Sequence, residues 1–418
     1  MALKRSGNAP TFSGWGVVAA AFAVLFVVYG IQFSFGVFVD DIADDTGWSE
    51  NRVQLVFALY ILGYSALSAV SGFLTDRFGP RRVVGIGGVV LTAGYLVWAG
   101  APNLWIVLLG LGIIAPIGMS ASWVPCNATI VRWFIRRRGL ALAVSTTGGS
   151  LANIAIPPLA AALVEAWGWR RALAAMAGVG GAVMLVASTR FHRDPESLGQ
   201  QPDGDPAPPG AGEPLTGLTP RDALRTTAYW LVLCMYALSF LVVFVPFVHI
   251  NQFATGLGVG SVQAATAISA IGIGGIAGRL SAGPVSDRFG RKRVAIVAFG
   301  LETLAFALMA GAQDMGLLYP AAVAFGFSYG ATVTLLPALV GDFFGRAHAG
   351  TIVGRIFATA GSLAAVGPYV AQLLVDASGS YRIAFLLSGG ANAAALLMAT
   401  RLPAGTAGQV KTERGATR

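Results

Sequence analysis

A chain of 418 residues in which 55% are hydrophobic and only 11% are charged differs from a soluble globular protein, where about 25% of residues carry charge. This composition argues against a soluble protein and predicts one that crosses the membrane many times. The net charge of +9 is then expected in loops at the membrane surface, so nucleic acid is not an expected partner.

The chain divides into apolar runs of about 20 residues, the length of helix that crosses the hydrocarbon core of a bilayer. Twelve such runs are predicted, at residues 14–39, 53–75, 83–101, 104–131, 139–164, 171–189, 228–252, 262–286, 294–312, 316–341, 350–375 and 382–400. The first is too long for a cleaved signal peptide and lacks a small-residue cleavage pattern, so we expect it to persist as a membrane helix. The predicted fold class is therefore an all-α polytopic membrane protein.

The basic residues indicate how the chain is oriented. Two of the 28 lysines and arginines, Arg279 and Arg355, lie deep inside apolar runs, and four lie in the loops on one side or at their edges, namely Arg52, Arg170, Arg171 and Arg382. The remaining 22 (28 − 2 − 4) occupy the other side, together with both termini. Because cytoplasmic loops carry the basic excess, we expect a multi-pass protein of the cell (inner) membrane with both termini in the cytoplasm.

Residues 191–225 separate the sixth and seventh runs. Their proline, glycine and acidic content does not support a packed core, so a flexible linker is expected. The predicted domains are a six-helix bundle at 1–190, a cytoplasmic linker at 191–226, a second six-helix bundle at 227–402 and a cytoplasmic tail at 403–418.

The two halves also repeat short phrases in the same order. GFLTDRFGPRR at 72–82 returns as GPVSDRFGRKR at 283–293, and TGGSLA at 147–152 returns as TAGSLA at 359–364. Ordered matches at a nearly constant offset are typical of a parallel duplication.

The repeated loop resembles the signature loop of the major facilitator superfamily. The resemblance covers essentially the whole chain and implies two pseudo-symmetric six-helix bundles that work by alternating access. Each copy supplies a glycine for close helix approach, an aspartate that can accept hydrogen bonds from a neighbouring helix N-terminus or from a basic side chain, and a turn glycine. The expected gating residues are Gly72, Asp76, Arg77 and Gly79 in the first copy and Gly283, Asp287, Arg288 and Gly290 in the second.

Arg279 is the strongest candidate for substrate binding. It lies eight residues before Asp287, about 12 Å deeper along a helix. A cation inside a membrane helix costs about 2.5–3.5 kcal/mol on insertion scales, so it should face water, a counter-ion or an anionic ligand. A snorkelling arginine or a fixed ion pair is the alternative.

RWFIRRRGLALA at 132–143, VPFVHINQFATGLG at 245–258 and the helix-borne Arg279 resemble the monocarboxylate porters and the oxalate/formate antiporters. The resemblance implies that Arg279 binds a substrate carboxylate. The chain departs from these families at Gly275 and Phe33, where eukaryotic members carry an acid and a lysine. It also has Ala360 near the second cation of the oxalate type, and Arg355 lies too near the cytoplasm to replace that cation. One deep cation favours a monocarboxylate over a dianion.

Other polar residues on the predicted membrane helices are weaker candidates, because each can equally join two helices. The further substrate-binding candidates are Tyr29, Gln32, Tyr64, Asn127, Asn153 and Tyr329. His249 is a candidate for proton coupling, since histidine titrates near working pH. For Glu302 an interface or pairing role is favoured. The aromatic residues that either line the cavity or belong to the core are Phe33, Phe35, Trp123, Phe240, Phe244 and Tyr329.

No nucleotide fingerprint, catalytic constellation or metal-ligand cluster appears in the sequence, and the two cysteines, Cys126 and Cys234, lie in apolar runs. We therefore expect a transporter rather than an enzyme, without cofactor or metal, that works as a monomer. The predicted partners are a small organic anion, a proton and the lipid bilayer, with no nucleic acid. A substrate exchanger or an efflux pump is the alternative function, and a sensor without transport is a more distant one.

Overall fold

The computed structural model describes residues 12–48, 50–205 and 215–403. Within these residues the first half consists of helices α1 (Gly14–Phe33), α2 (Phe35–Thr46), α3 (Glu50–Phe78), α4 (Pro80–Ala99), α5 (Leu104–Val107), the π-helix η1 (Leu108–Ile114), α6 (Ala115–Trp133), α7 (Arg138–Trp167) and α8 (Trp169–Ser188). The second half consists of α10 (Thr227–Gly256), α11 (Ser261–Phe289), α12 (Arg291–Gly311), α13 (Met315–Phe344), α14 (Ala349–Ala364), α15 (Gly367–Ser378) and α16 (Tyr381–Thr400). Between the halves lie the short helices η2 (Glu196–Leu198), η3 (Pro202–Gly204) and α9 (Pro220–Ala223).

Twelve spans of the described chain are long and apolar enough to cross a membrane. α1 with the start of α2, α5 with η1 and α6, and α14 with α15 each make one span, and the other nine come from single helices or parts of them. Large apolar side chains such as Ile86, Val186 and Val297 are more than 60% exposed on the bundle surface, as expected for residues that face lipid. The all-α polytopic prediction is confirmed.

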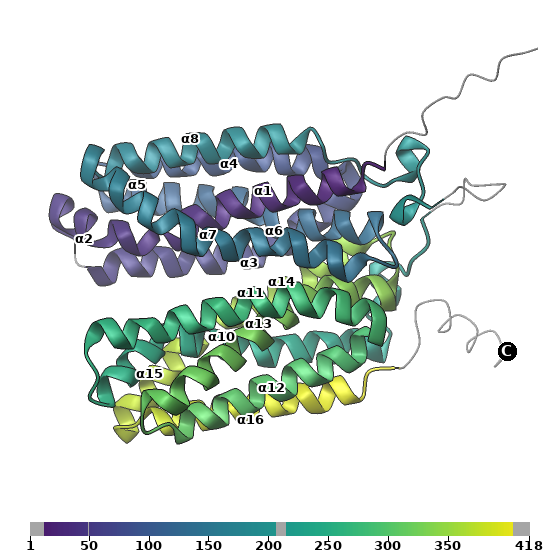
Figure 1. Ribbon diagram of the computed structural model, residues 1–418. Helices are drawn as coiled ribbons and strands as arrows, with labels where there is room; N and C mark the ends of the chain where they lie inside the picture. The colour runs from purple at the N-terminus through teal and green to yellow at the C-terminus, as the bar shows by residue number, and fades with distance from the viewer. Residues whose placement is uncertain (1–11, 49, 206–214, 404–418) are drawn as a thin grey trace, which may run out of the picture.

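The helices form two bundles, one from α1–α8 and one from α10–α16, which lie side by side (Figure 1). The main contacts between the bundles pair α3 with α14 and α7 with α11. α3 and α11 are the helices that end in the repeated loop, so the duplication in the sequence is also a symmetry of the interface. We call the end of the molecule that carries residues 76–82 and 287–293 the motif face.

Residues at both ends of the expected linker contact the motif face, while 206–214 between them lie outside the described residues, and the flexible or disordered linker stays a prediction. The Asp203 carboxylate accepts hydrogen bonds from three consecutive backbone N–H groups at residues 135–137, over 2.9–3.1 Å. Glu196 forms an ion pair with Arg346 at 2.9 Å, and the N–H of Leu218 donates to the carbonyl of Phe344. The acidic side chains of the linker thus accept hydrogen bonds from backbone N–H groups and pair with basic residues at the motif face. The proline and glycine content of the segment does not predict these contacts.

The predicted domain boundaries remain predictions, since contacts of the linker do not decide where an independently folding unit ends. Most of the predicted tail, 404–418, lies outside the described residues.

Candidate functional site

A cavity of about 290 Å³ lies between the two bundles. It is lined by α1, α3, α6 and α7 from the first half and by α10, α11, α13 and α14 from the second. Six of the seven predicted substrate-binding residues line it, namely Tyr29, Gln32, Tyr64, Asn153, Arg279 and Tyr329. These residues are up to 300 positions apart in the chain (329 − 29), and the duplicated fold brings them to one place.

Among the residues that line the cavity, the one that carries a charge is Arg279, and its side chain is only 8% exposed. Its Nη1 donates to the Thr146 carbonyl at 3.3 Å and to the Ser150 hydroxyl, both on α7 of the other half. The guanidinium carbon lies 5.5 Å from the centroid of the Tyr329 ring. Within the described chain, Arg279 forms no ion pair with a carboxylate, and its Nε has no hydrogen-bond partner. This geometry leaves a buried positive charge whose balancing anion is not a protein side chain of the described residues.

Close contact between α11 and α13 positions Arg279. A Cβ atom added at Gly278 would collide with the Phe327 carbonyl, and one added at Gly330 would collide with the Gly275 carbonyl and lie 3.0 Å from the Arg279 backbone nitrogen. Small residues four apart let membrane helices approach this closely, and both helices carry the pattern at Gly274–Gly278 and Gly326–Gly330. The sequence contains this signal, although sequence reasoning did not use it.

Two predicted residues lie outside the cavity. Asn127 is fully buried, and its amide donates to the Trp123 carbonyl at 2.7 Å, so the structure does not bring it to the site. His249 is buried against α15, with Nε2 3.0 Å from the Pro368 carbonyl and Nδ1 3.4 Å from Gln252 Oε1. Neither residue is placed where it meets a ligand in the cavity.

Aromatic rings make up nine of the 25 residues that line the cavity, compared with 10% of the whole chain. Five of the six rings expected either in the cavity or in the core are among them: Phe33, Trp123, Phe240, Phe244 and Tyr329. Phe35 instead stacks on Phe57 in the core of the first half, with ring centroids 4.0 Å apart.

At the motif face, Asp76 joins the two halves. Its carboxylate pairs with Arg132 at 2.6 Å and accepts hydrogen bonds from the Gly350 N–H at 3.1 Å and from the Thr351 N–H and hydroxyl, each at 2.6 Å. Gly350 and Thr351 begin α14, so the aspartate of one half caps a helix of the other. A carboxylate at a helix N-terminus is favourable because it satisfies free N–H groups and the positive end of the helix dipole.

Asp287 makes the symmetric contact. It accepts hydrogen bonds from the N–H groups of Gly139 at 2.8 Å and Leu140 at 3.0 Å, which begin α7, and pairs with Arg291 at 2.9 Å. Asp342 then bridges Arg291 at 2.7 Å and Arg138 at 2.6 Å. Together these contacts join the two halves at the motif face, and we call the two aspartates with their partners the latch.

The remaining predicted gating residues divide into two groups. Gly72 and Gly283 lie against the backbone of Gly350 and Gly139, where a Cβ would collide, and Gly79 and Gly290 have φ of 87° and 91°, which favour glycine. Arg77 and Arg288 are exposed, lie beside the rings of Phe78 and Phe289, and take part in no ion pair of the described chain. The structure therefore does not bring these two arginines into the latch.

Sequence reasoning missed the partners of the aspartates. The latch also uses Arg132, Arg138, Arg291, Asp342 and Thr351. The matched segments RWF at 132–134 and DFF at 342–344 carried the signal, since polar residues at equivalent places in two halves are expected to meet near the pseudo-two-fold axis. In the part of the chain that the structure describes, no group of three or more metal-ligating side chains gathers in one place.

Comparisons with known proteins agree with this architecture. The family model of the Major Facilitator Superfamily matches residues 21–288 and 253–418. The chain is 30% identical to human monocarboxylate transporter 11 over 90% of this chain and 80% of that protein, and 29% identical to monocarboxylate transporter 13 of cattle over 90% and 86%.

Solved structures show the same fold at low sequence identity. The human organic anion transporter MFSD10 superposes with a TM-score of 0.68 at 18% identity, over 94% of this chain and all of the other. The proton:xylose symporter XylE superposes with a TM-score of 0.72 at 13% identity, over 93% of this chain and 96% of the other. From the family match and the similarity to monocarboxylate transporters, we conclude that the chain is a transporter, not an enzyme, and belongs to the major facilitator superfamily.

Proposed function

We propose that the protein moves a small monocarboxylate across the membrane together with a proton, by alternating access. The observation that carries the proposal is the buried guanidinium of Arg279, which lines the cavity and has no carboxylate partner within the described chain. A carboxylate that enters the cavity exchanges its water for charge-assisted hydrogen bonds to this group. A single cation balances a single carboxylate, which favours a monoanion.

The departures from the eukaryotic pattern refine this proposal. Gly275 and Phe33, which stand where those proteins carry an acid and a lysine, both line the cavity. The site therefore offers the substrate one charge and an otherwise apolar or hydroxyl-bearing wall. This supports recognition by Arg279 without a second cation.

The latch supplies one of the two gates that alternating access requires. With Asp76 and Asp287 engaged, the cavity is closed at the motif face. We propose that this face is cytoplasmic, because it carries most of the basic residues, and that the structure represents a state closed to the cytoplasm.

Cysteine labelling tests the orientation. A cysteine placed at Gly204, in the linker, should react with a membrane-impermeant maleimide only from the cytoplasmic side, and one at Thr46, at the end of α2, only from outside. Thr412 lies outside the described residues, and a cysteine there should behave like that at Gly204. Reaction of Gly204 from outside and Thr46 from inside would reverse the assignment.

For the proton we propose Glu302 in place of His249. Glu302 on α12 is fully buried, and its two oxygens each lie 3.4 Å from the Ser239 hydroxyl on α10, next to the cavity residue Phe240. It forms no ion pair within the described chain. Acidic side chains buried within membrane helices are rare, and in transporters they mark proton relays.

The pH response separates these two residues. Uptake should rise as the outside pH falls and collapse when the proton gradient is dissipated, because a co-transported proton cancels the charge of the anion. Glu302→Gln should flatten this dependence, while His249→Ala should keep it, measured as initial uptake between pH 5.5 and 8. A flat pH profile in His249→Ala together with a normal one in Glu302→Gln would instead assign the proton-coupling role to His249.

Uptake in proteoliposomes with a panel of labelled acids tests the function as a whole. The proposal expects accumulation of a monocarboxylate driven by an inward proton gradient alone. Uptake that requires substrate inside the vesicle would instead identify an exchanger, and outward movement of neutral compounds would identify an efflux pump.

A further inference from the structure

The aromatic rings of the cavity come from both halves and from six helices. They comprise Tyr29, Phe33, Tyr64, Trp123, Phe240, Phe244, Phe247, Tyr329 and Phe357. In a cavity that only had to hold a small hydroxy acid, this much flat apolar surface would face water with nothing to contact. Aromatic side chains instead favour a ligand that buries its own apolar surface against them.

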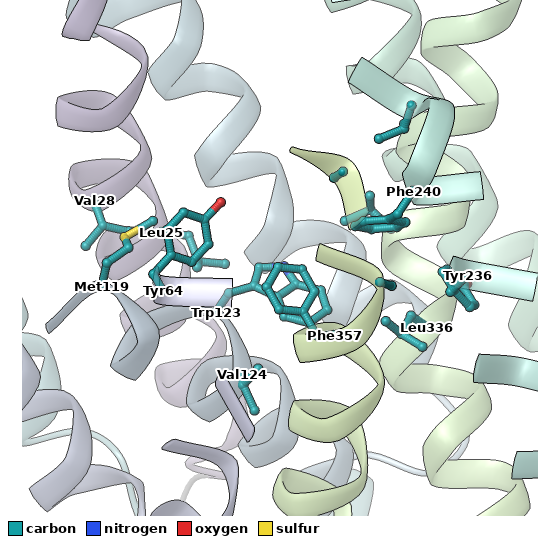
Figure 2. Packing of buried hydrophobic residues seen from close by; sticks show 14 of the residues in the cluster. Leu25, Val28, Tyr64, Met119, Trp123, Val124, Tyr236, Phe240, Leu336 and Phe357 are labelled. Atoms are coloured by element: carbon teal, nitrogen blue, oxygen red, sulfur yellow. The ribbon is translucent and has the colours of Figure 1, made fainter. Parts of the chain in front are cut away.

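The rings near the interface of the halves form a continuous surface. Trp123 on α6 stacks on Phe357 on α14 with ring centroids 4.6 Å apart at 26°, and Phe240 on α10 meets the edge of Phe357 at 6.1 Å and 83°. Figure 2 shows the Trp123 and Phe357 rings overlapping between the bundles, with Phe240 on the neighbouring helix. This arrangement presents both a ring face and ring edges to the cavity, the two geometries that aromatic pairs prefer.

The aromatic surface extends to the charged end of the cavity. Phe247 meets Tyr329 at 5.3 Å and 73°, and the Tyr329 ring lies beside the Arg279 guanidinium at 5.5 Å. A ligand whose carboxylate reaches Arg279 therefore has aromatic side chains next to the rest of its structure. Along the cavity, the Arg279 guanidinium is followed by aromatic side chains.

The cavity size agrees with a substrate larger than acetate or lactate. Its volume of about 290 Å³ is near the lower end of small-molecule pockets, which span about 300–1,000 Å³. Since a water-sized group takes about 30 Å³ of liquid, the space fits on the order of ten non-hydrogen atoms. A three-carbon acid, with about five or six non-hydrogen atoms, would leave close to half of it empty or filled with poorly bonded water.

We propose that the substrate is an aryl monocarboxylate, an acid with one carboxylate and one flat ring separated by a short linker. The proposal rests on the proposed function, because it uses Arg279 as the carboxylate site. The new element of the proposal is that the rest of the substrate is an aromatic ring, which the aromatic side chains of the cavity bind by stacking and edge contacts.

Competition binding to the purified full-length protein tests the class. Phenylacetate should bind three- to tenfold more tightly than cyclohexylacetate, which has the same carbon skeleton but no flat ring, and at least tenfold more tightly than acetate. Phenylacetamide, which keeps the ring and lacks the charge, should compete poorly.

A substitution in the aromatic surface should remove the preference. Phe357→Leu should reduce the phenylacetate-to-cyclohexylacetate affinity ratio at least threefold. The matched control is Phe306→Leu on α12, where a fully buried phenylalanine packs on Phe325 outside the cavity lining. A ratio of affinities does not depend on how much protein is correctly folded, so a partly unstable variant still reports on the site.

The outcomes separate the two proposals. If the acids bind and depend on Arg279 but phenylacetate and cyclohexylacetate bind equally, the aryl inference is overturned and the proposed function stands. An unchanged ratio in Phe357→Leu, or the same loss in Phe306→Leu, also overturns the inference. If none of the acids binds, both proposals fail.

Discussion

Arg279→Ala should weaken carboxylate binding about 100-fold. Each hydrogen bond to a charged group contributes about 1.5–3 kcal/mol, and the guanidinium fork offers a carboxylate two of them. Arg279→Lys keeps the charge but loses the fork, so it should bind at least tenfold more weakly, about 1.4 kcal/mol. Titration of the purified protein with phenylacetate measures both effects.

Arg355→Ala is the matched control for this prediction. Arg355 also lies in a membrane span, on α14, but it is not among the residues that line the cavity. Its removal should change the affinity by less than threefold. Binding that survives Arg279→Ala unchanged, or that falls equally in Arg355→Ala, would remove the carboxylate site.

Asp76→Asn should destabilise the closed motif face by about 2 kcal/mol, roughly a 30-fold shift in population. Asparagine keeps the shape of the side chain but loses the ion pair with Arg132 and the charge that caps α14. Asp287→Asn should act in the same direction at α7. We expect transport to slow more than substrate binding weakens, because the latch does not touch the cavity.

Spin labels at Arg82 and Arg293, which are exposed at the ends of α4 and α12, measure this opening as a longer distance between the halves. Arg77→Gln is the control, since Arg77 lies in the same loop and outside the latch contacts. If either aspartate variant keeps the short distance and turns over normally while binding weakly, the aspartates belong to substrate binding instead.

Much of the architecture follows from the sequence because a bilayer imposes simple lengths and the chain repeats itself. Both latch aspartates were expected to accept hydrogen bonds from a helix N-terminus or from a basic side chain, and in the structure each of them does both. These predictions depend on a helix as a whole or on a repeated loop, for which the pattern in the sequence is strong.

The two candidates that lie outside the cavity show what such patterns lack. His249 follows Phe247 by two residues, about 200° around a helix, so when Phe247 faces the cavity His249 faces α15. Asn127 lies one turn beyond Trp123 toward the motif face, below the level at which the packed halves close the cavity. A fully apolar helix shows little preference for one face, so its rotation and the depth of the cavity come only from tertiary packing.

The most direct test of the account compares an acid with its own amide. Phenylacetate and phenylacetamide should be titrated into wild-type protein and into Arg279→Gln at the same pH. Wild-type protein should bind the acid at least tenfold more tightly than the amide, and the variant, which lacks the cation, should bind the two equally. An acid preference that persists in Arg279→Gln would contradict the claim that this arginine selects the substrate.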